Sequence, residues 1–135
     1  MEKLLMGIDV GTSACKAALF DPGGNVIAQS AKGYKVYYPA PGYAEQNPLE
    51  WWKAICLAVQ EMICTSRIDA RRIAGIGVAG QSWSAIPVDR RGKVLCNTPI
   101  WMDTRAEGMC RKVIERLGPD RIFRVCGNPF EPTYT

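Results

Sequence analysis

The sequence has no histidine, no C-x-x-C pair among its six cysteines, no long apolar run and no run of basic residues. Histidine is the commonest general base in enzymes, so a proton transfer here would need another group. A zinc site is poorly supported, because paired cysteines and histidines are the usual zinc ligands. No stretch reaches the length of a membrane span, and no basic stripe with interleaved aromatics argues for nucleic acid.

The chain has 135 residues, about one ordinary domain, and its 47% apolar content suffices for one hydrophobic core. The formal charge of +4 arises from scattered Lys and Arg, apart from the pairs Arg71-Arg72 and Arg90-Arg91 in expected turns. Free thiols suit a reducing compartment, and the N-terminus lacks a signal-peptide pattern, so we expect a cytoplasmic protein.

The stretch from residue 4 to residue 20 predicts an apolar strand, a tight polar turn and a second apolar strand. Asp9 ends the first strand, Lys16 lies on the second, and the turn consists of Gly11, Thr12 and Ser13. Small turn residues let backbone N–H groups approach an anion, and a carboxylate beside that anion can hold a divalent cation. From these residues alone, an ordinary β-hairpin with a polar turn explains the pattern equally well.

The segment Gly7-Ile-Asp-Val-Gly-Thr-Ser13, followed by Lys16, resembles the first phosphate-binding hairpin of the superfamily of sugar kinases, heat-shock ATPases and actin. Within it, the chain is most similar to the FGGY carbohydrate kinases, which include xylulokinase, gluconokinase and glycerol kinase. The resemblance implies an α/β fold of the RNase H-like (actin-like ATPase) type, with a mixed sheet, an N-terminal antiparallel hairpin and flanking helices. It also implies phosphoryl transfer from ATP to a sugar hydroxyl with Mg²⁺ as cofactor.

The same resemblance assigns roles in the hairpin. Asp9 would hold the metal ion or its waters. The phosphates would be contacted by Gly11, Thr12, Ser13 and Lys16.

Residues 47–50 carry a helix-start pattern, since Asn47 can cap, Pro48 suits the first helical position and Glu50 lies three residues after the cap. Apolar residues then recur at helical spacing and predict a buried face: Trp52, Ile55, Val59, Met62 and Ile63. The segment 42–48, followed by Trp51 and Trp52, also resembles the family's Glu-Gln-x-Pro and Trp pattern, for which we expect a structural role.

Residues 73–79 are apolar and rich in glycine, which predicts a buried strand. It ends in the polar residues Gln81 and Ser82 and in Trp83. Ligands of open α/β sheets gather beyond strand ends, so these three residues are candidates for a sugar pocket. The alternative is a simple strand-to-strand turn with Trp83 in the core.

Residues 99–105 are expected to contain the end of a short strand, followed by Trp101, Asp103 and Arg105. Asp103 is placed to cap the following helix, whose apolar residues are Met109, Val113, Ile114 and Leu117. The family resemblance instead implies a sugar site, in which Trp101 stacks on the sugar, Asp103 accepts its hydroxyls and Arg105 fixes Asp103. The two roles are compatible.

Other segments predict a third strand over 26–37, a hairpin over 86–95 with its turn at 89–92, and a short helix over 120–126 that ends at Gly127. Residues 129–135 are expected to form a loop. In it, Tyr134 falls where glycerol kinase-like members place a sugar-contacting tyrosine.

FGGY kinases are much longer than this chain, so we expect residues 1–135 to be the N-terminal part of the first of two lobes, inactive alone. The family's catalytic aspartate and adenosine site would lie beyond residue 135. By overall resemblance, a ketopentose such as xylulose is the first choice of sugar and gluconate is an alternative. After the family glutamine that Gln81 matches, xylulokinases usually carry Met-His and glycerol kinases carry Arg-Glu, whereas this chain has Ser82-Trp83 and matches neither. The lack of the Arg-Glu pair argues against glycerol. A homodimer is possible for the full-length protein.

Two other classes of function remain open on the sequence. A nucleotide-dependent scaffold of the actin or heat-shock type would share the hairpin but would not need the motifs at 80–83 and 101–105. A plain interaction domain would leave the polar strand ends without a role.

Overall fold

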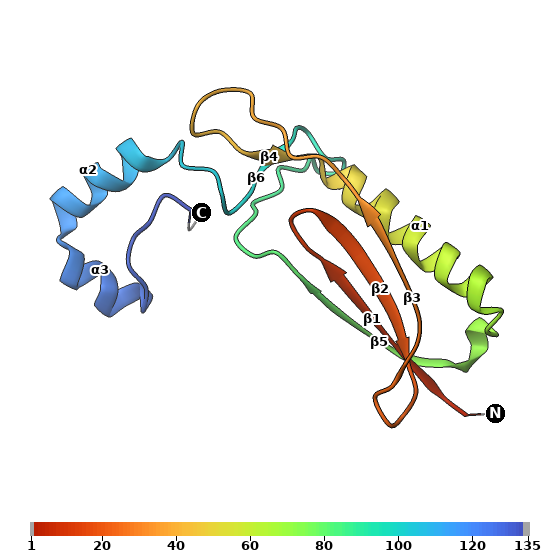
Figure 1. Ribbon diagram of the computed structural model, residues 1–135. Helices are drawn as coiled ribbons and strands as arrows, with labels where there is room; N and C mark the ends of the chain where they lie inside the picture. Colours follow the sequence, from red (N-terminus) through yellow and green to blue (C-terminus); the bar gives the residue numbers. More distant parts are fainter. Residues whose placement is uncertain (1, 134–135) are drawn as a thin grey trace. The chain divides into compact units, whose positions relative to one another are not determined.

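The computed structural model describes residues 2–133, which divide into two compact bodies (Figure 1). The first body consists of the chain up to Val36 together with Asn47–Gln81. The second consists of Tyr37–Gln46 together with the chain from Ser82 onward. Each body contains its own sheet, four-stranded in the first and two-stranded in the second.

The sheet of the first body has the strand order β3-β2-β1-β5. Its strands are β1 (Leu4–Val10), β2 (Ala14–Phe20), β3 (Val26–Gly33) and β5 (Ile73–Gly80). The first three strands pair antiparallel, and β5 joins β1 in parallel. The expected mixed α/β sheet with an N-terminal antiparallel hairpin is therefore confirmed.

Helix α1 (Pro48–Ser66) covers one face of this sheet, against β2 and β3 (Figure 1). It begins as expected, because the Asn47 side chain accepts a hydrogen bond from the Leu49 N–H at 3.0 Å. The buried core between helix and sheet consists of Met6, Ala17, Leu19, Ala58 and Met62. A single 3₁₀ turn, η1 (Ala70–Arg72), with Asp69 as its cap, leads into β5.

The buried position expected for Trp52 is wrong, since its side chain is 67% exposed. The buried side of α1 runs through Ala54, Ala58 and Met62. Trp52 lies two residues from Ala54, about 200° around the helix, so it points away from the sheet. The other part of the expectation holds, because Val59 and Ile63 pack against the core.

The burial predicted for β5 is also wrong. Ile76 and Val78 are 62% and 70% exposed. In the described chain β5 is the edge strand beyond β1, while α1 lies over β2 and β3. An apolar sequence is typical of a strand covered on both faces, but these residues have no cover from the described part of the chain.

The third strand is shorter than the predicted 26–37, because β3 ends at Gly33. Its last pair is Gly33 with Ala14, the first residue of β2, so the ladder ends where the partner strand begins. Tyr37 belongs to the second body, where it makes an isolated bridge to Glu45.

The second body contains β4 (Glu45–Gln46), β6 (Thr98–Pro99), α2 (Glu107–Leu117) and α3 (Pro119–Cys126). The predicted hairpin over 86–95 has its turn, closed by a 3.0 Å hydrogen bond from the Gly92 N–H to the Asp89 carbonyl. In place of the two predicted strands, the structure has one isolated β-bridge, between Val88 and Val94. The end of the last helix at Gly127, which has φ +72°, is confirmed.

The predicted cap of α2 is wrong. The residue at the N-cap is Ala106, and no side chain caps the helix. Asp103 lies too early in the chain, because the turn from Thr104 to Glu107 stands between it and the helix. Its carboxylate is engaged elsewhere, as described below.

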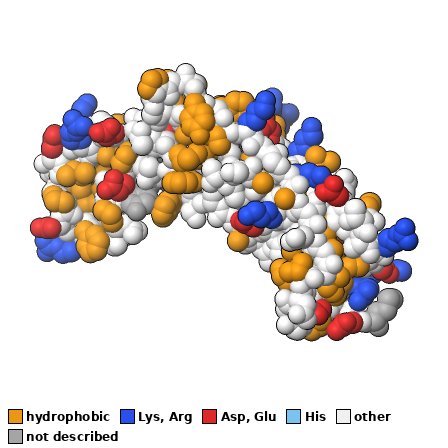
Figure 2. All heavy atoms as spheres, in the orientation of Figure 1, with side chains coloured by type: hydrophobic (Ala, Val, Ile, Leu, Met, Phe, Trp, Pro, Cys, Tyr) orange, Lys and Arg blue, Asp and Glu red, His pale blue; other side chains and the backbone are white. Residues whose placement is uncertain are grey.

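Much of the expected apolar side of α2 is exposed, including Met109 at 72%. Hydrophobic side chains are visible on the surface over α2 and α3 in Figure 2, and Phe123 and Val125 are among the exposed ones. No helix within residues 2–133 is long and apolar enough to cross a bilayer.

Candidate functional site

The predicted strand, turn and strand at the N-terminus are confirmed. β1 ends at Val10, β2 begins at Ala14, and the three residues between them form the turn. The Gly11 N–H donates to the Ala14 carbonyl at 3.1 Å and closes it. Gln81 lies beside this turn, because its N–H donates to the Val10 carbonyl at 2.9 Å at the end of β5.

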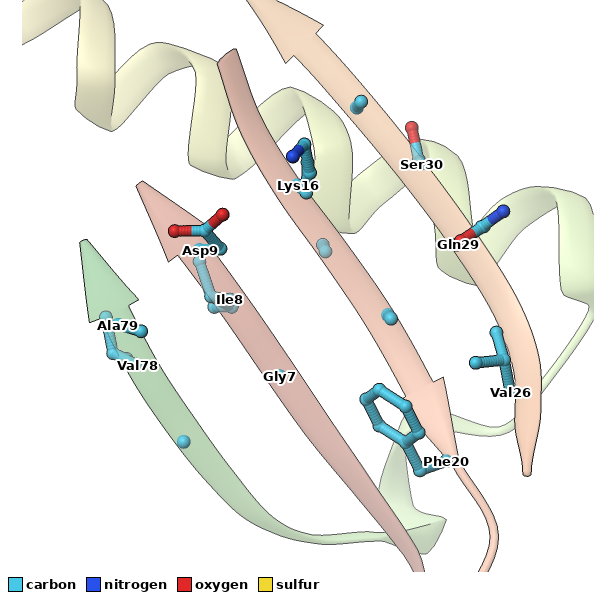
Figure 3. Close-up of a pocket in the computed structure, with 14 residues that line it drawn as sticks. Gly7, Ile8, Asp9, Lys16, Phe20, Val26, Gln29, Ser30, Val78 and Ala79 are labelled. Carbon is cyan, nitrogen blue, oxygen red and sulfur yellow. The ribbon is translucent and has the colours of Figure 1, made fainter. Parts of the chain in front are cut away.

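Asp9 and Lys16 face each other across the first hairpin. They are direct partners in the register of β1 and β2, and Figure 3 shows both side chains on the same face of the sheet. Both residues are exposed. The pair therefore presents one negative and one positive group next to the turn.

A Cβ built on Gly11 would lie 3.8 Å from Asp9 Oδ2 and 3.4 Å from the Ala14 carbonyl oxygen. Both are ordinary van der Waals distances, so a side chain would fit at residue 11 but would take up part of the space beside the carboxylate. A ligand atom can approach Asp9 and the turn backbone together through this space.

The pair lies at one end of a hollow of about 910 Å³ on the face of the sheet away from α1 (Figure 3). The remaining lining is mostly small or apolar, with residues from all four strands. It includes Gly7, Ala18, Phe20, Gln29, Gly77 and Val78. Asp9 and Lys16 supply its only charged groups among the described residues.

Within residues 2–133, no group of three or more His, Cys, Asp or Glu side chains could hold a metal ion. This rules out a metal cage built by the described chain alone. Mg²⁺, however, retains several waters and is usually held by one or two carboxylates plus substrate phosphates. The Asp9 carboxylate beside the open space at Gly11 fits such an ion.

Cys15, the residue before Lys16, is fully buried. Burial and then the nearby Asp9 carboxylate raise the pKa of its thiol. The thiol therefore stays protonated and is a poor nucleophile.

In the second body, Asp103 and Arg105 are brought together as expected. Asp103 is 4% exposed, and Arg105 donates to both of its carboxylate oxygens, with Nη2 2.7 Å from Oδ2. The Ala44 N–H donates to Oδ2 at 2.8 Å, and the Arg105 N–H donates to Oδ1 at 3.0 Å. These donors occupy the lone pairs of the carboxylate, so little capacity remains to accept from a sugar hydroxyl.

Arg105 also contacts two residues that the sequence analysis did not single out for the site. Its Nη2 lies 2.6 Å from Glu45 Oε1, and its guanidinium lies 3.9 Å from the centroid of the Tyr43 ring. The hydrogen bonds that Arg105 donates to the Asp103 carboxylate raise the pKa of Arg105, so the guanidinium stays charged. No local sequence signal links residues 43–45 to Arg105, because the contact depends on how the chain folds back.

The two tryptophans of the second body are partly exposed, Trp83 at 52% and Trp101 at 45%, so a core position for Trp83 is wrong. Trp83 has φ +62°, a left-handed backbone that non-glycine residues rarely adopt. Such strain often accompanies binding sites. Ser82 precedes it and is exposed, while Tyr134 lies outside the described residues.

The sequence-predicted residues therefore form two groups. The first body brings Gln81 to the base of the turn that lies beside Asp9 and Lys16. The second body holds Ser82, Trp83, Trp101, Asp103 and Arg105.

Comparison with known proteins identifies related chains. The model of the N-terminal domain of the FGGY family of carbohydrate kinases matches residues 4–135. Xylulose kinase of Bacillus subtilis is 36% identical over 93% of this chain, and gluconokinase of the same organism is 33% identical over 98%. Each match covers 25% of the relative, so the chain spans about a quarter of the length of these proteins.

Solved structures agree with the sequence comparison. The crystal structure of a xyloylose kinase from Brucella ovis superposes with a TM-score of 0.87 at 31% identity, covering 98% of this chain and 27% of that one. The fold is thus that of the N-terminal part of these kinases, of the actin-like type. The hairpin with Asp9, the matched family model and the superposed structure together show that this chain belongs to the FGGY family of carbohydrate kinases.

Proposed function

We propose that this chain is the N-terminal part of the first lobe of an ATP-dependent kinase that phosphorylates a sugar hydroxyl. The observation that carries the proposal is the pairing of Asp9 with Lys16 beside the glycine turn. Phosphoryl transfer needs positive groups and N–H donors around the phosphate oxygens, and little covalent chemistry from the protein.

The residues of the hairpin would act in the following way. Backbone N–H groups of the turn Gly11, Thr12 and Ser13 would donate to phosphate oxygens of ATP, and Lys16 would neutralise part of their charge. Asp9 would hold Mg²⁺ directly or through its waters. When bound, this ion supplies Lewis-acid stabilisation of the charge on the phosphates.

On the sugar side, we propose that Gln81, Ser82, Trp83 and Trp101 contact the substrate. Amide and hydroxyl groups would bond its hydroxyls, and the indole rings would cover its C–H faces. The bonding of Asp103 favours a different role from direct contact. Its carboxylate and Arg105 would hold the loop that carries Trp101. Tyr134 remains a candidate contact from the resemblance alone.

A ketopentose such as xylulose is the proposed substrate, because the relative with 36% identity is a xylulose kinase. The gluconokinase is only slightly less similar at 33%, so gluconate is the alternative sugar. A nucleotide-binding scaffold of the actin or heat-shock type is the alternative function, and it would release ADP without a sugar.

The full-length gene product should be assayed for ADP release with ATP and a panel of xylulose, ribulose, gluconate and glycerol. We expect release that depends on one sugar, with the highest kcat/KM for a ketopentose. The highest value for gluconate would change the substrate but retain the kinase. Sugar-independent ADP release would favour the scaffold.

A further inference from the structure

Tyr34 contacts the phosphate-side turn at two points. It is the first residue after β3, and its N–H donates to the Ser13 carbonyl at 3.3 Å. Its phenolic O–H donates to the Gly11 carbonyl, which lies 23 residues earlier in the chain. One half-buried tyrosine thus holds both ends of the three-residue turn.

The two accepting carbonyls belong to peptide groups that also carry N–H donors. In a trans peptide the C=O and the next residue's N–H point in opposite directions, and no described peptide here is cis. Fixing the Gly11 carbonyl toward Tyr34 therefore turns the Thr12 N–H to the opposite side. The same reasoning applies to the Ser13 carbonyl and the Ala14 N–H.

Another contact closes the turn from within, because the Gly11 N–H donates to the Ala14 carbonyl. This hydrogen bond engages the Gly11 N–H and does not involve the Gly11 carbonyl. Among the contacts described for this turn, the Tyr34 hydroxyl is the one that holds the Gly11 carbonyl. Its effect is on orientation, which matters because preorganised donors stabilise anions more strongly than donors that must reorient.

We propose that Tyr34 is a positioning residue for phosphate binding, which acts by orienting the Gly11–Thr12 peptide toward the phosphate oxygens of ATP. This inference rests on the proposed function, because it takes the turn to be the phosphate site. Tyr34 itself touches no substrate in this account. Its contribution passes through the Gly11 carbonyl.

The protonation state of Tyr34 suits a permanent donor. Burial, followed by the nearby Cys15 and Asp9, raises the pKa of Tyr34 to about 12. The hydroxyl therefore keeps its proton over the pH range in which enzymes are assayed. A phenolate at this place could not donate to the carbonyl.

Tyr34→Phe in the full-length protein tests the inference, because it removes one oxygen and keeps the ring. We expect kcat/KM for ATP to fall about tenfold, as for the loss of one hydrogen bond, while the KM for the sugar changes less than about twofold. Tyr38→Phe is the matched control, since Tyr38 is 67% exposed, and it should leave both constants unchanged. Melting temperatures of all variants are measured alongside.

A second variant keeps both the ring and the hydroxyl. Replacing Tyr34 with 3,5-difluorotyrosine lowers the pKa of the phenol, so kcat/KM for ATP should fall as the pH rises through that lower value. The wild type should show no such loss. This variant gives a result even if Tyr34→Phe does not fold.

Unchanged kcat/KM for ATP per folded molecule in Tyr34→Phe, or identical pH profiles of the fluorinated protein and the wild type, would overturn the inference. Equal losses for ATP and sugar, together with a lower melting temperature, would reduce Tyr34 to a general structural role and would also overturn it. If the wild type shows no ATP-dependent activity, the proposed function fails first, and the inference falls with it.

Discussion

Arg105 and Asp103 form a bidentate pair in the second body. Arg105 Nε lies 2.9 Å from Oδ1 and 3.0 Å from Oδ2 of Asp103, and Nη2 lies 2.7 Å from Oδ2. Backbone donors from Ala44 and Arg105 complete the shell of the buried carboxylate. Through the hydrogen bond from Ala44, the pair links the segment just before β4 to the loop after β6.

Asp103→Asn should destabilise the protein by about 1–3 kcal/mol, because the amide cannot accept all these donors and leaves some of them unsatisfied. The measurement is urea unfolding at pH 7. Glu115→Gln, at an exposed position of α2, is the control and should have almost no effect. A loss below about 0.5 kcal/mol in Asp103→Asn would show that the pair is dispensable.

The same carboxyl group predicts a pH dependence. Burial alone would raise the pKa of Asp103, but hydrogen bonds from Arg105 and Ala44 outweigh it and lower the pKa below the ordinary value. A carboxyl group whose pKa is lower in the folded protein stabilises the fold at pH values above its pKa in the unfolded chain, which is about 3.9. This stability is lost as the pH falls through the lower pKa of the folded state. Between pH 7 and pH 2, the wild type should therefore lose more stability than Asp103→Asn. Parallel pH curves for the two proteins would contradict the assignment.

The backbone conformation of Trp83 leads us to expect an unusual order of stability for its replacement by glycine and by alanine. Because residue 83 has φ +62°, glycine should be more stable there than alanine by about 0.5–1 kcal/mol, although glycine is the more flexible residue. Thermal unfolding of Trp83→Gly and Trp83→Ala measures the difference. If the indole contacts the sugar, both variants should raise the KM for the sugar about equally, with the KM for ATP unchanged.

Lys16→Met should lower kcat/KM for ATP by about tenfold to a hundredfold, the range for one hydrogen bond to a charged group. Lys16 lies opposite Asp9 at the hairpin, whereas the exposed Lys35 follows Tyr34 and has no assigned role. Lys35→Met is therefore the control for the lost charge. Equal values of kcat/KM for ATP in the two variants would show that Lys16 does not contribute to phosphate binding.

The sequence predicted the elements well where a local cause determines them. Asn47 and Pro48 set the start of α1, and the polar turn at 11–13 separates β1 from β2. Exposure was harder to predict. Trp52 matched a helical period, but a period does not say which apolar side of a largely apolar helix faces the sheet.

The sequence predicted the motifs of the site but not the contacts that hold these motifs in place. Asp9 and Lys16 follow from a short local pattern, whereas the contacts of Tyr34 with Gly11 and of Glu45 with Arg105 join residues far apart in the chain. Strand ends and loop closure bring these residues together. A single sequence carries no signal for such pairs.

The most direct test of the account is the rate of sugar-dependent ADP release by the full-length protein carrying Asp9→Asn. We expect kcat to fall by about two orders of magnitude or more, while sugar affinity stays within about twofold, because a metal-holding carboxylate acts mainly on the transition state. Asp120→Asn, an exposed carboxylate in α3, serves as the control. Near-normal kcat in Asp9→Asn would show that Asp9 is only a turn residue and would contradict the proposed phosphate site.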